Sequence, residues 1–145
     1  RIDIAKDSLH NVLSSSDILF INESEASLLS GKKTIYDSAS LFLDLGLKMV
    51  VVKKGGQGAE LFSNEENIKI GAYKVNVVDP TGAGDVFGGA FISTLAQGGT
   101  LSDSLVNGSA MASFCVQGFG TSCILNVSEE EFEHRKSNLY STLSS

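Results

Sequence analysis

The residues best suited to chemistry lie in one short segment, Asp79-Pro80-Thr81-Gly82-Ala83-Gly84-Asp85. Two valines precede it as the end of an expected strand, and an amphipathic helix is expected to follow it. Small side chains at Gly82, Ala83 and Gly84 let backbone N–H groups approach an anion closely, and a helix N-terminus adds a partial positive charge. The segment therefore predicts an anion hole built mainly from the main chain.

Asp85 closes this segment and has two interpretations. A carboxylate beside a bound phosphate is repelled by its ligand, so its presence needs a reason, and removal of a proton from an acceptor hydroxyl supplies one. Alternatively, the segment is only a tight turn from strand to helix, and Asp85 belongs to the helix start. We take Asp85 as the candidate catalytic base.

The segment matches neither of two widespread nucleotide motifs. The P-loop pattern Gly-x-x-x-x-Gly-Lys-Ser/Thr is missing, and no Gly-x-Gly-x-x-Gly follows a strand as in dinucleotide-binding folds. The segment instead resembles the second signature of the ribokinase-like carbohydrate kinases, also called the phosphofructokinase-B type. The resemblance implies transfer of the ATP γ-phosphoryl group to a hydroxyl of a sugar or nucleoside, with Asp85 as base and Thr81 beside the nucleotide.

A second segment of the same family is recognisable at Asn22-Glu23-Ser24-Glu25, directly after an expected strand. It resembles the family's Asn-x-x-Glu motif, which implies that Asn22 and Glu25 help to place Mg²⁺, largely through water. Mg²⁺ prefers oxygen ligands and keeps several waters, so a carboxylate and an amide can orient it without enclosing it. In the alternative, Asn22 or Ser24 only caps a short helix over residues 26–29.

A third segment, Lys53-Lys54-Gly55-Gly56-Gln57-Gly58, resembles the family's loop for the nucleotide phosphates and ribose. The resemblance implies that Lys53 contacts a phosphate and that Gly55, Gly56 and Gly58 admit the nucleotide. For Lys54 the alternative is a solvated lysine ahead of a glycine turn.

Residues 109–120 resemble the family segment that lines the adenine pocket. Ser109, Ala110 and Ser113 are small enough to leave room for a base, although small residues on a helix also serve close packing. In several relatives a monovalent cation such as K⁺ lies beside the anion hole. Its oxygens would correspond here to Asp79, Thr81, Cys115, Gly118 and Gly120. Asp79 has the alternative of bonding to the neighbouring loop backbone.

The elements that must position these residues alternate between strands and helices. The spacing of apolar residues predicts a helix over 4–13, a strand over 17–21, a helix over 34–45 ended by Gly46, and a strand over 49–52. The last strand is apolar on both faces, which indicates a parallel sheet. Three short antiparallel strands are expected next, over 59–62, 68–70 and 75–78, with a turn at 64–67. Three helices are expected after them, over 84–97, 101–116 and 128–143.

With the resemblance, this order implies a ribokinase-like three-layer α/β/α fold with a largely parallel sheet and a small antiparallel edge. We expect residues 1–145 to be the C-terminal nucleotide-binding and catalytic part only, without the family's N-terminal acceptor-binding part and lid. Two other interpretations stay open. The chain could be a nucleotide-binding module without catalysis, or a structural fragment whose uncovered apolar surface drives aggregation or homodimer formation.

The amino-acid composition argues against some classes of binding partner. The net charge is −6 and no cluster of Lys and Arg is present, so neither nucleic acid nor an anionic membrane is an expected partner. Cys115 and Cys123 are too few for a disulfide framework, so reduced thiols and a cytoplasmic location are expected. No stretch approaches the roughly 18 apolar residues of a membrane span.

Overall fold

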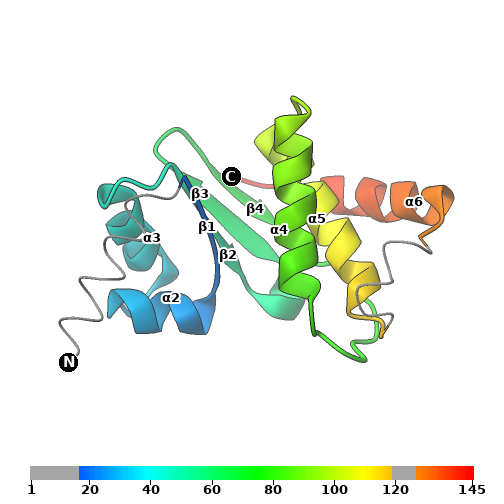
Figure 1. Ribbon diagram of the computed structural model, residues 1–145, viewed down its shortest axis with the longest axis horizontal. Coiled ribbons are helices and arrows are strands. Elements are labelled where there is room, and N and C mark those ends of the chain that lie inside the picture. The colour runs from blue at the N-terminus through cyan, green and yellow to red at the C-terminus, as the bar shows by residue number, and fades with distance from the viewer. Residues whose placement is uncertain (1–16, 119–126) are drawn as a thin grey trace. The chain divides into compact units, whose positions relative to one another are not determined.

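The computed structural model describes residues 17–118 and 127–145 (Figure 1). The predicted helix at 4–13 and the residues Gly120 and Cys123 lie outside this part of the chain. The described residues form two compact units, one of residues 17–54 and 59–68 and one of 55–58 and 69–144, and each is described by itself. The elements are β1 (Ile18–Asn22), α2 (Glu23–Ser30), α3 (Ile35–Asp44), β2 (Met49–Lys53), a 3₁₀ turn (Gly55–Gln57), β3 (Ala59–Ser63), β4 (Asn67–Ile70), α4 (Ala83–Ala96), α5 (Leu101–Cys115) and α6 (Glu129–Tyr140).

The sheet runs in the order β1-β2-β3-β4. β1 and β2 are parallel, with Asn22 opposite Lys53, and β3 is antiparallel to β2, with Lys53 opposite Ala59. The predicted strand-helix-strand unit and its parallel pairing are thereby confirmed. The four-stranded sheet is mixed, however, and not largely parallel, because β2 has a parallel neighbour on one side and an antiparallel neighbour on the other.

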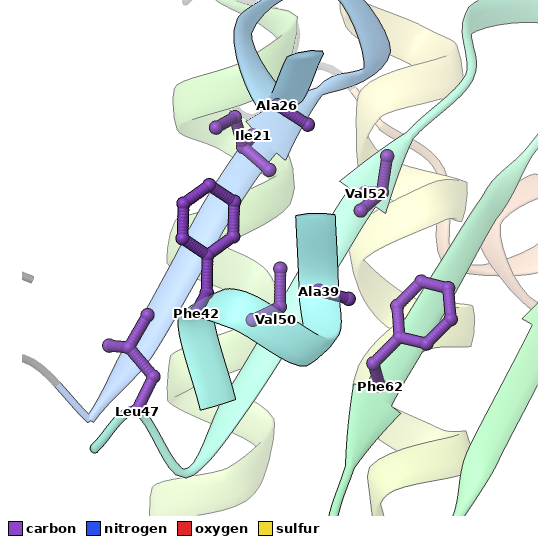
Figure 2. Packing of buried hydrophobic residues seen from close by; sticks show 8 residues of the cluster. All are labelled: Ile21, Ala26, Ala39, Phe42, Leu47, Val50, Val52 and Phe62. Carbon is purple, nitrogen blue, oxygen red and sulfur yellow. The ribbon is translucent and has the colours of Figure 1, made fainter. Parts of the chain in front are cut away.

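Two helices of the first unit cover one face of this sheet. Thr34 caps α3 by accepting a hydrogen bond from the N–H of Asp37 (3.1 Å), as expected for a helix that starts at Ile35. Figure 2 shows Phe42 of α3 and Val50 of β2 within the same cluster of buried side chains. The core of this unit consists of Ile21, Ala26, Ala39, Phe42, Leu47, Val50, Val52 and Phe62. Burying such side chains contributes roughly 1.5–3 kcal/mol each.

Three helices make up most of the second unit, and α4 and α5 lie side by side within it (Figure 1). Their contact is close at Gly108, where an added Cβ would lie 3.0 Å from the carbonyl oxygen of Phe87. α5 begins with a capping box in which Thr100 and Asp103 bond each other's backbone N–H. α6 is capped by Ser128 and so starts where the helix over 128–143 was predicted to start, but it ends at Tyr140 rather than near residue 143.

The predicted strand at 75–78 is wrong. Residues 71–77 have no regular structure, and Val77 and Val78 are 64% and 71% exposed. Next to this stretch, an isolated parallel bridge joins Asp79 to Gln117. A run of β-branched residues favours a strand only where another strand accepts its hydrogen bonds, and the described residues offer none here.

Within the described part of the chain, no helix combines the length and the apolar character that crossing a bilayer would require.

Candidate functional site

The loop from Asp79 to Asp85 joins the extended segment to α4 in the second unit. Gly82 is the N-cap of α4 with φ 82°, a conformation that favours glycine, and it has no side chain to cap the helix. The Ala83 N–H donates to the carbonyl of Pro80 (3.1 Å), and the Val86 N–H donates to the carbonyl of Gly82 (3.0 Å). A β-turn therefore leads straight into the first turn of the helix.

Two N–H donors of this first turn have no acceptor within the described part of the chain. Among residues 17–118 and 127–145, no group accepts a hydrogen bond from the N–H of Gly84 or of Asp85. The first N–H groups of any helix lack internal partners, and here no capping side chain replaces them. Gly84 is half-buried and Asp85 is exposed, so both amides and the carboxylate lie at an accessible helix start. An anion can bind here without breaking an existing hydrogen bond.

Asp79 holds the base of this loop together. Its Oδ1 accepts a hydrogen bond from the Thr81 N–H (2.9 Å), so the predicted alternative of a bond to the loop backbone is confirmed. Hydrogen bonds from the Thr81 side chain and backbone lower the pKa of Asp79 below its usual 3.8. The carboxylate is thus ionised at neutral pH.

Four of the five residues predicted to surround a monovalent cation lie near one another. The Sγ of Cys115 lies 3.7 Å from the Thr81 carbonyl oxygen, Asp79 is bridged to Gln117, and an added Cβ on Gly118 would lie 3.0 Å from Val78. Gly120 lies outside the described residues. The Thr81 carbonyl oxygen lies in this cluster, and a cation site stays a prediction.

In the first unit, Asn22 and Lys53 are register partners at the carboxyl ends of two parallel strands. Ligands of open α/β sheets bind beyond this end of the strands. Asn22 Oδ1 accepts from the Glu25 N–H (2.8 Å) and Glu25 Oε2 accepts from the Asn22 N–H (3.2 Å), which is a capping box for α2. The predicted capping alternative is therefore confirmed for Asn22.

The same arrangement fits a magnesium site that acts through water. Asn22 and Glu25 are both exposed, and capping engages one of the two Glu25 carboxylate oxygens in the hydrogen bonds of the described residues. No group of three or more His, Cys, Asp or Glu side chains in this part of the chain could enclose a metal ion. A carboxylate oxygen that is not used in capping, at a site that does not enclose the ion, suits a Mg²⁺ that keeps its waters.

The interpretation of Lys54 as a solvated lysine is wrong. Its Nζ lies 2.9 Å from Oε1 of Glu60, which is fully buried on β3. Oε2 of Glu60 has no hydrogen-bond partner among the described residues. A buried carboxylate must be paired because its desolvation is costly, so Lys54 is held by Glu60. Glu60 escaped the sequence analysis, although one charged residue in the apolar run Ala59-Glu60-Leu61-Phe62, six positions after Lys54, is a readable signal.

The glycines of the loop after β2 differ in the space around them. Gly55 and Gly56 are exposed, and a Cβ added to either would meet nothing within 4 Å. A Cβ on Gly58 would lie 1.9 Å from the carbonyl oxygen of Ile70. Nucleotide access at Gly55 and Gly56 stays a prediction, whereas Gly58 is required by the neighbouring backbone.

The predicted adenine contacts also differ from one another. Ala110 is fully buried, and the hydroxyl of Ser113 donates to the Ala110 carbonyl and accepts from Arg135. Ser109 alone of the three is not buried. Close packing, the alternative considered above, accounts for Ala110 and Ser113 as they stand, and adenine binding by this helix stays a prediction centred on Ser109.

The structure thus brings Asn22, Glu25 and Lys53 together in one unit and residues 79–85 together in the other. Sequence analysis missed two polar residues of the second unit, Arg135 and Gln117, which bond each other (2.8 Å). No periodicity or motif marks them, because their importance depends on which helices meet.

Comparison with known proteins identifies the family of the chain. The model of the pfkB family carbohydrate kinases matches residues 1–126. Ribokinase of Staphylococcus aureus is 39% identical over 127 residues, which are 83% of this chain and 42% of that protein. ATP-dependent 6-phosphofructokinase of Thermoanaerobacterium thermosaccharolyticum is 37% identical over 106 residues, or 73% of this chain and 33% of that protein.

The fold is shared with solved structures of the same kind. An E. coli protein assigned as ribokinase II, solved in complex with ATP and Mg²⁺, superposes with a TM-score of 0.82 at 36% identity over 94% of this chain and 44% of that one. The chain therefore spans less than half the length of these relatives. Since the family model covers most of the chain and the motifs follow in the same order, the chain belongs to the pfkB family of carbohydrate kinases.

Proposed function

We propose that this chain is the C-terminal nucleotide-binding and catalytic part of a kinase that transfers the γ-phosphoryl group of ATP to a hydroxyl of a sugar or nucleoside. The observation that carries the proposal is the start of α4. There the N–H groups of Gly84 and Asp85 lack acceptors among the described residues, beside the exposed Asp85 carboxylate. Main-chain donors next to one acid suit phosphoryl transfer better than they suit a purely structural turn.

In this proposal the Asp85 carboxylate accepts the proton of the acceptor hydroxyl while that oxygen forms its bond to the γ-phosphorus. The bond from the γ-phosphorus to the bridging oxygen breaks, and ADP leaves. The N–H groups of Gly84 and Asp85 donate to the oxygens of the group in transfer, where negative charge is stabilised. Mg²⁺ supplies charge neutralisation when bound, and Asn22 and Glu25 are the residues that would hold its waters.

Isothermal titration of this chain with ATP and Mg²⁺ tests the proposal, and α4 offers a matched pair of variants. Gly84→Asp adds a negative charge at the unpaired amides, where an acidic residue does not harm the helix itself. Gly89→Asp adds the same charge further along α4, at a position with no neighbour within 4 Å. We expect Gly84→Asp to weaken ATP binding about tenfold or more, roughly 1.4 kcal/mol, and Gly89→Asp to leave it nearly unchanged.

Equal effects of the two variants, or no binding of ATP by the unaltered chain, would contradict the nucleotide site. Asp85→Asn is expected to preserve ATP binding, because it removes the base and keeps the backbone donors.

A second candidate is a nucleotide-binding module without catalysis. The observation that favours it is the span of less than half of the relatives' length. A phosphoryl-transfer assay with sugars and nucleosides separates the two candidates, since ATP binding with no product from any acceptor would favour the module.

A further inference from the structure

Arg135 of α6 is the most deeply buried cation among the described residues, with 6% of its surface exposed. Its guanidinium donates from Nε to Oε1 of Glu131 (3.0 Å), from Nη1 to Oγ of Ser113 (2.9 Å) and from Nη2 to Oε1 of Gln117 (2.8 Å). Its central carbon lies 3.7 Å from the ring centroid of Phe114. An arginine is rarely buried unless it is paired. These bonds therefore fix α6 to α5 and to the turn after α5.

The turn after α5 in turn supports the loop that leads into α4. The carbonyl of Val116 accepts hydrogen bonds from the N–H of Val78 (2.8 Å) and of Asp79 (3.1 Å). Gln117 itself forms the isolated bridge with Asp79. Asp79 then accepts from the Thr81 N–H at the base of the anion loop.

We propose that Arg135, acting through Gln117, is a positioning residue for the phosphate-binding loop over residues 79–85. This inference rests on the proposed function of that loop. In the hydrogen bonds and ring contacts of the described residues, Arg135 does not contact residues 79–85. It holds the side chain of Gln117, whose backbone, with that of Val116, fixes Asp79 and thereby the orientation of the loop. The alternative is a guanidinium that only stabilises the packing of α5 against α6.

Substitutions at Gln117 distinguish a positioning role of Arg135 from a role in helix packing alone. Its side chain is half-buried at an open pocket of about 450 Å³ that is also lined by Tyr73, Lys74, Val75, Asn76 and Arg135, so it can be replaced without overpacking a core. Gln117→Leu removes the acceptor for Arg135 at similar size, whereas Gln117→Glu keeps an acceptor oxygen. Lys136→Gln is a matched control on α6, because Lys136 bonds only Glu133 across the helix surface in the ion pairs of the described residues.

The test combines hydrogen–deuterium exchange, read on peptides that cover residues 76–86, with ATP and Mg²⁺ titration of the same 145-residue chain. We expect Gln117→Leu to speed exchange of the Val78, Asp79 and Thr81 amides about tenfold, because opening the loop no longer breaks the full network. We expect it to weaken ATP binding several-fold while the urea midpoint changes little. Gln117→Glu should retain the exchange of the unaltered chain, and Lys136→Gln should change neither measurement.

Faster exchange spread evenly over α4, α5 and α6, or unchanged exchange at residues 78–81, would overturn the inference and leave Arg135 a packing residue. Arg135→Lys is a second variant, and if it folds we expect the same faster exchange and weaker ATP binding as for Gln117→Leu. If Arg135→Lys does not fold, Gln117→Leu alone tests the inference. Failure of the unaltered chain to bind ATP would sink the proposed function, whereas the exchange measurement would still decide whether Gln117 holds the loop.

Discussion

Gly56 and Gly58 lie two residues apart in the loop after β2 and are under different constraints. Gly56 has an ordinary backbone conformation and open space around it, whereas Gly58 has φ 95° and faces the backbone of Ile70 and Gly71. An L-residue is strained at such a positive φ, and a backbone carbonyl cannot move aside as a flexible side chain can. Glycine is therefore required at Gly58 for folding, whereas neither the backbone conformation nor the described neighbours require it at Gly56.

We expect Gly58→Ala to destabilise the chain by roughly 2–5 kcal/mol, from overpacking and backbone strain together. Gly56→Ala should change the free energy of unfolding by well under about 1 kcal/mol. Urea unfolding followed by circular dichroism measures both. Similar stabilities for the two variants would show that the backbone of Ile70 yields, contrary to this interpretation.

At the level of elements, β2 and β3 are joined by the ion pair of Lys54 and Glu60. Val52 lies opposite Glu60, so the carboxylate is on the sheet face that packs against α3. A charged pair in such a place gives less stability than apolar packing would, but the loss of one partner leaves a charge buried alone. Since Lys54 directly follows Lys53, this pair also fixes the chain where the proposed nucleotide loop begins.

Lys54→Met should destabilise the chain by roughly 3–5 kcal/mol, because Glu60 then stays buried without a counter-charge. The double variant Lys54→Met/Glu60→Leu should recover most of that loss, since apolar packing replaces the pair. A double-mutant cycle on unfolding free energies gives the coupling. Additive effects of the two substitutions would argue against a buried pair.

The contact between Tyr140 of α6 and Asp103 of α5 adds a pH dependence. The hydroxyl of Tyr140 donates to Oδ1 of Asp103. This bond is the main cause that lowers the pKa of Asp103, while burial and the nearby carboxylate raise the pKa of Tyr140 to about 12. The contribution of Tyr140 to the free energy of unfolding is fully present below its unfolded pKa near 10 and is lost as pH rises toward 12. The contribution of Asp103 is present at neutral pH and is lost as pH falls below about 4.

Comparing the unaltered chain with Tyr140→Phe isolates this effect. At pH 7 the variant should be less stable by about 1 kcal/mol at most, because Tyr140 is 41% exposed. The difference should shrink between about pH 10 and 12. Thermal unfolding across that range measures it, and a difference independent of pH would show that the hydrogen bond is absent in solution.

For the whole molecule, the sequence predicted most elements because local periodicity and capping residues determine them. The helices predicted over 34–45, 101–116 and 128–143 are present, with N-caps at Thr34, Thr100 and Ser128. The apolar run at 49–52 predicted a strand with a parallel neighbour, which the structure confirms. The strand at 75–78 failed because strand formation depends on a partner elsewhere. The role of Arg135 could not be predicted for the same reason, since a buried charge is explained only by the groups that surround it. Glu60 differs, because a single charge in an apolar run is visible in the sequence.

The paired ends of β1 and β2 restrict how this chain can be varied. Strand side chains alternate between faces, so deleting one residue within 49–52 would turn Val50 and Val52 out of the core they share with α3. The same deletion would remove Lys53 from its place opposite Asn22. In this strand, a change of length would disturb the core and the proposed nucleotide site together, whereas a substitution can alter one and leave the other in place.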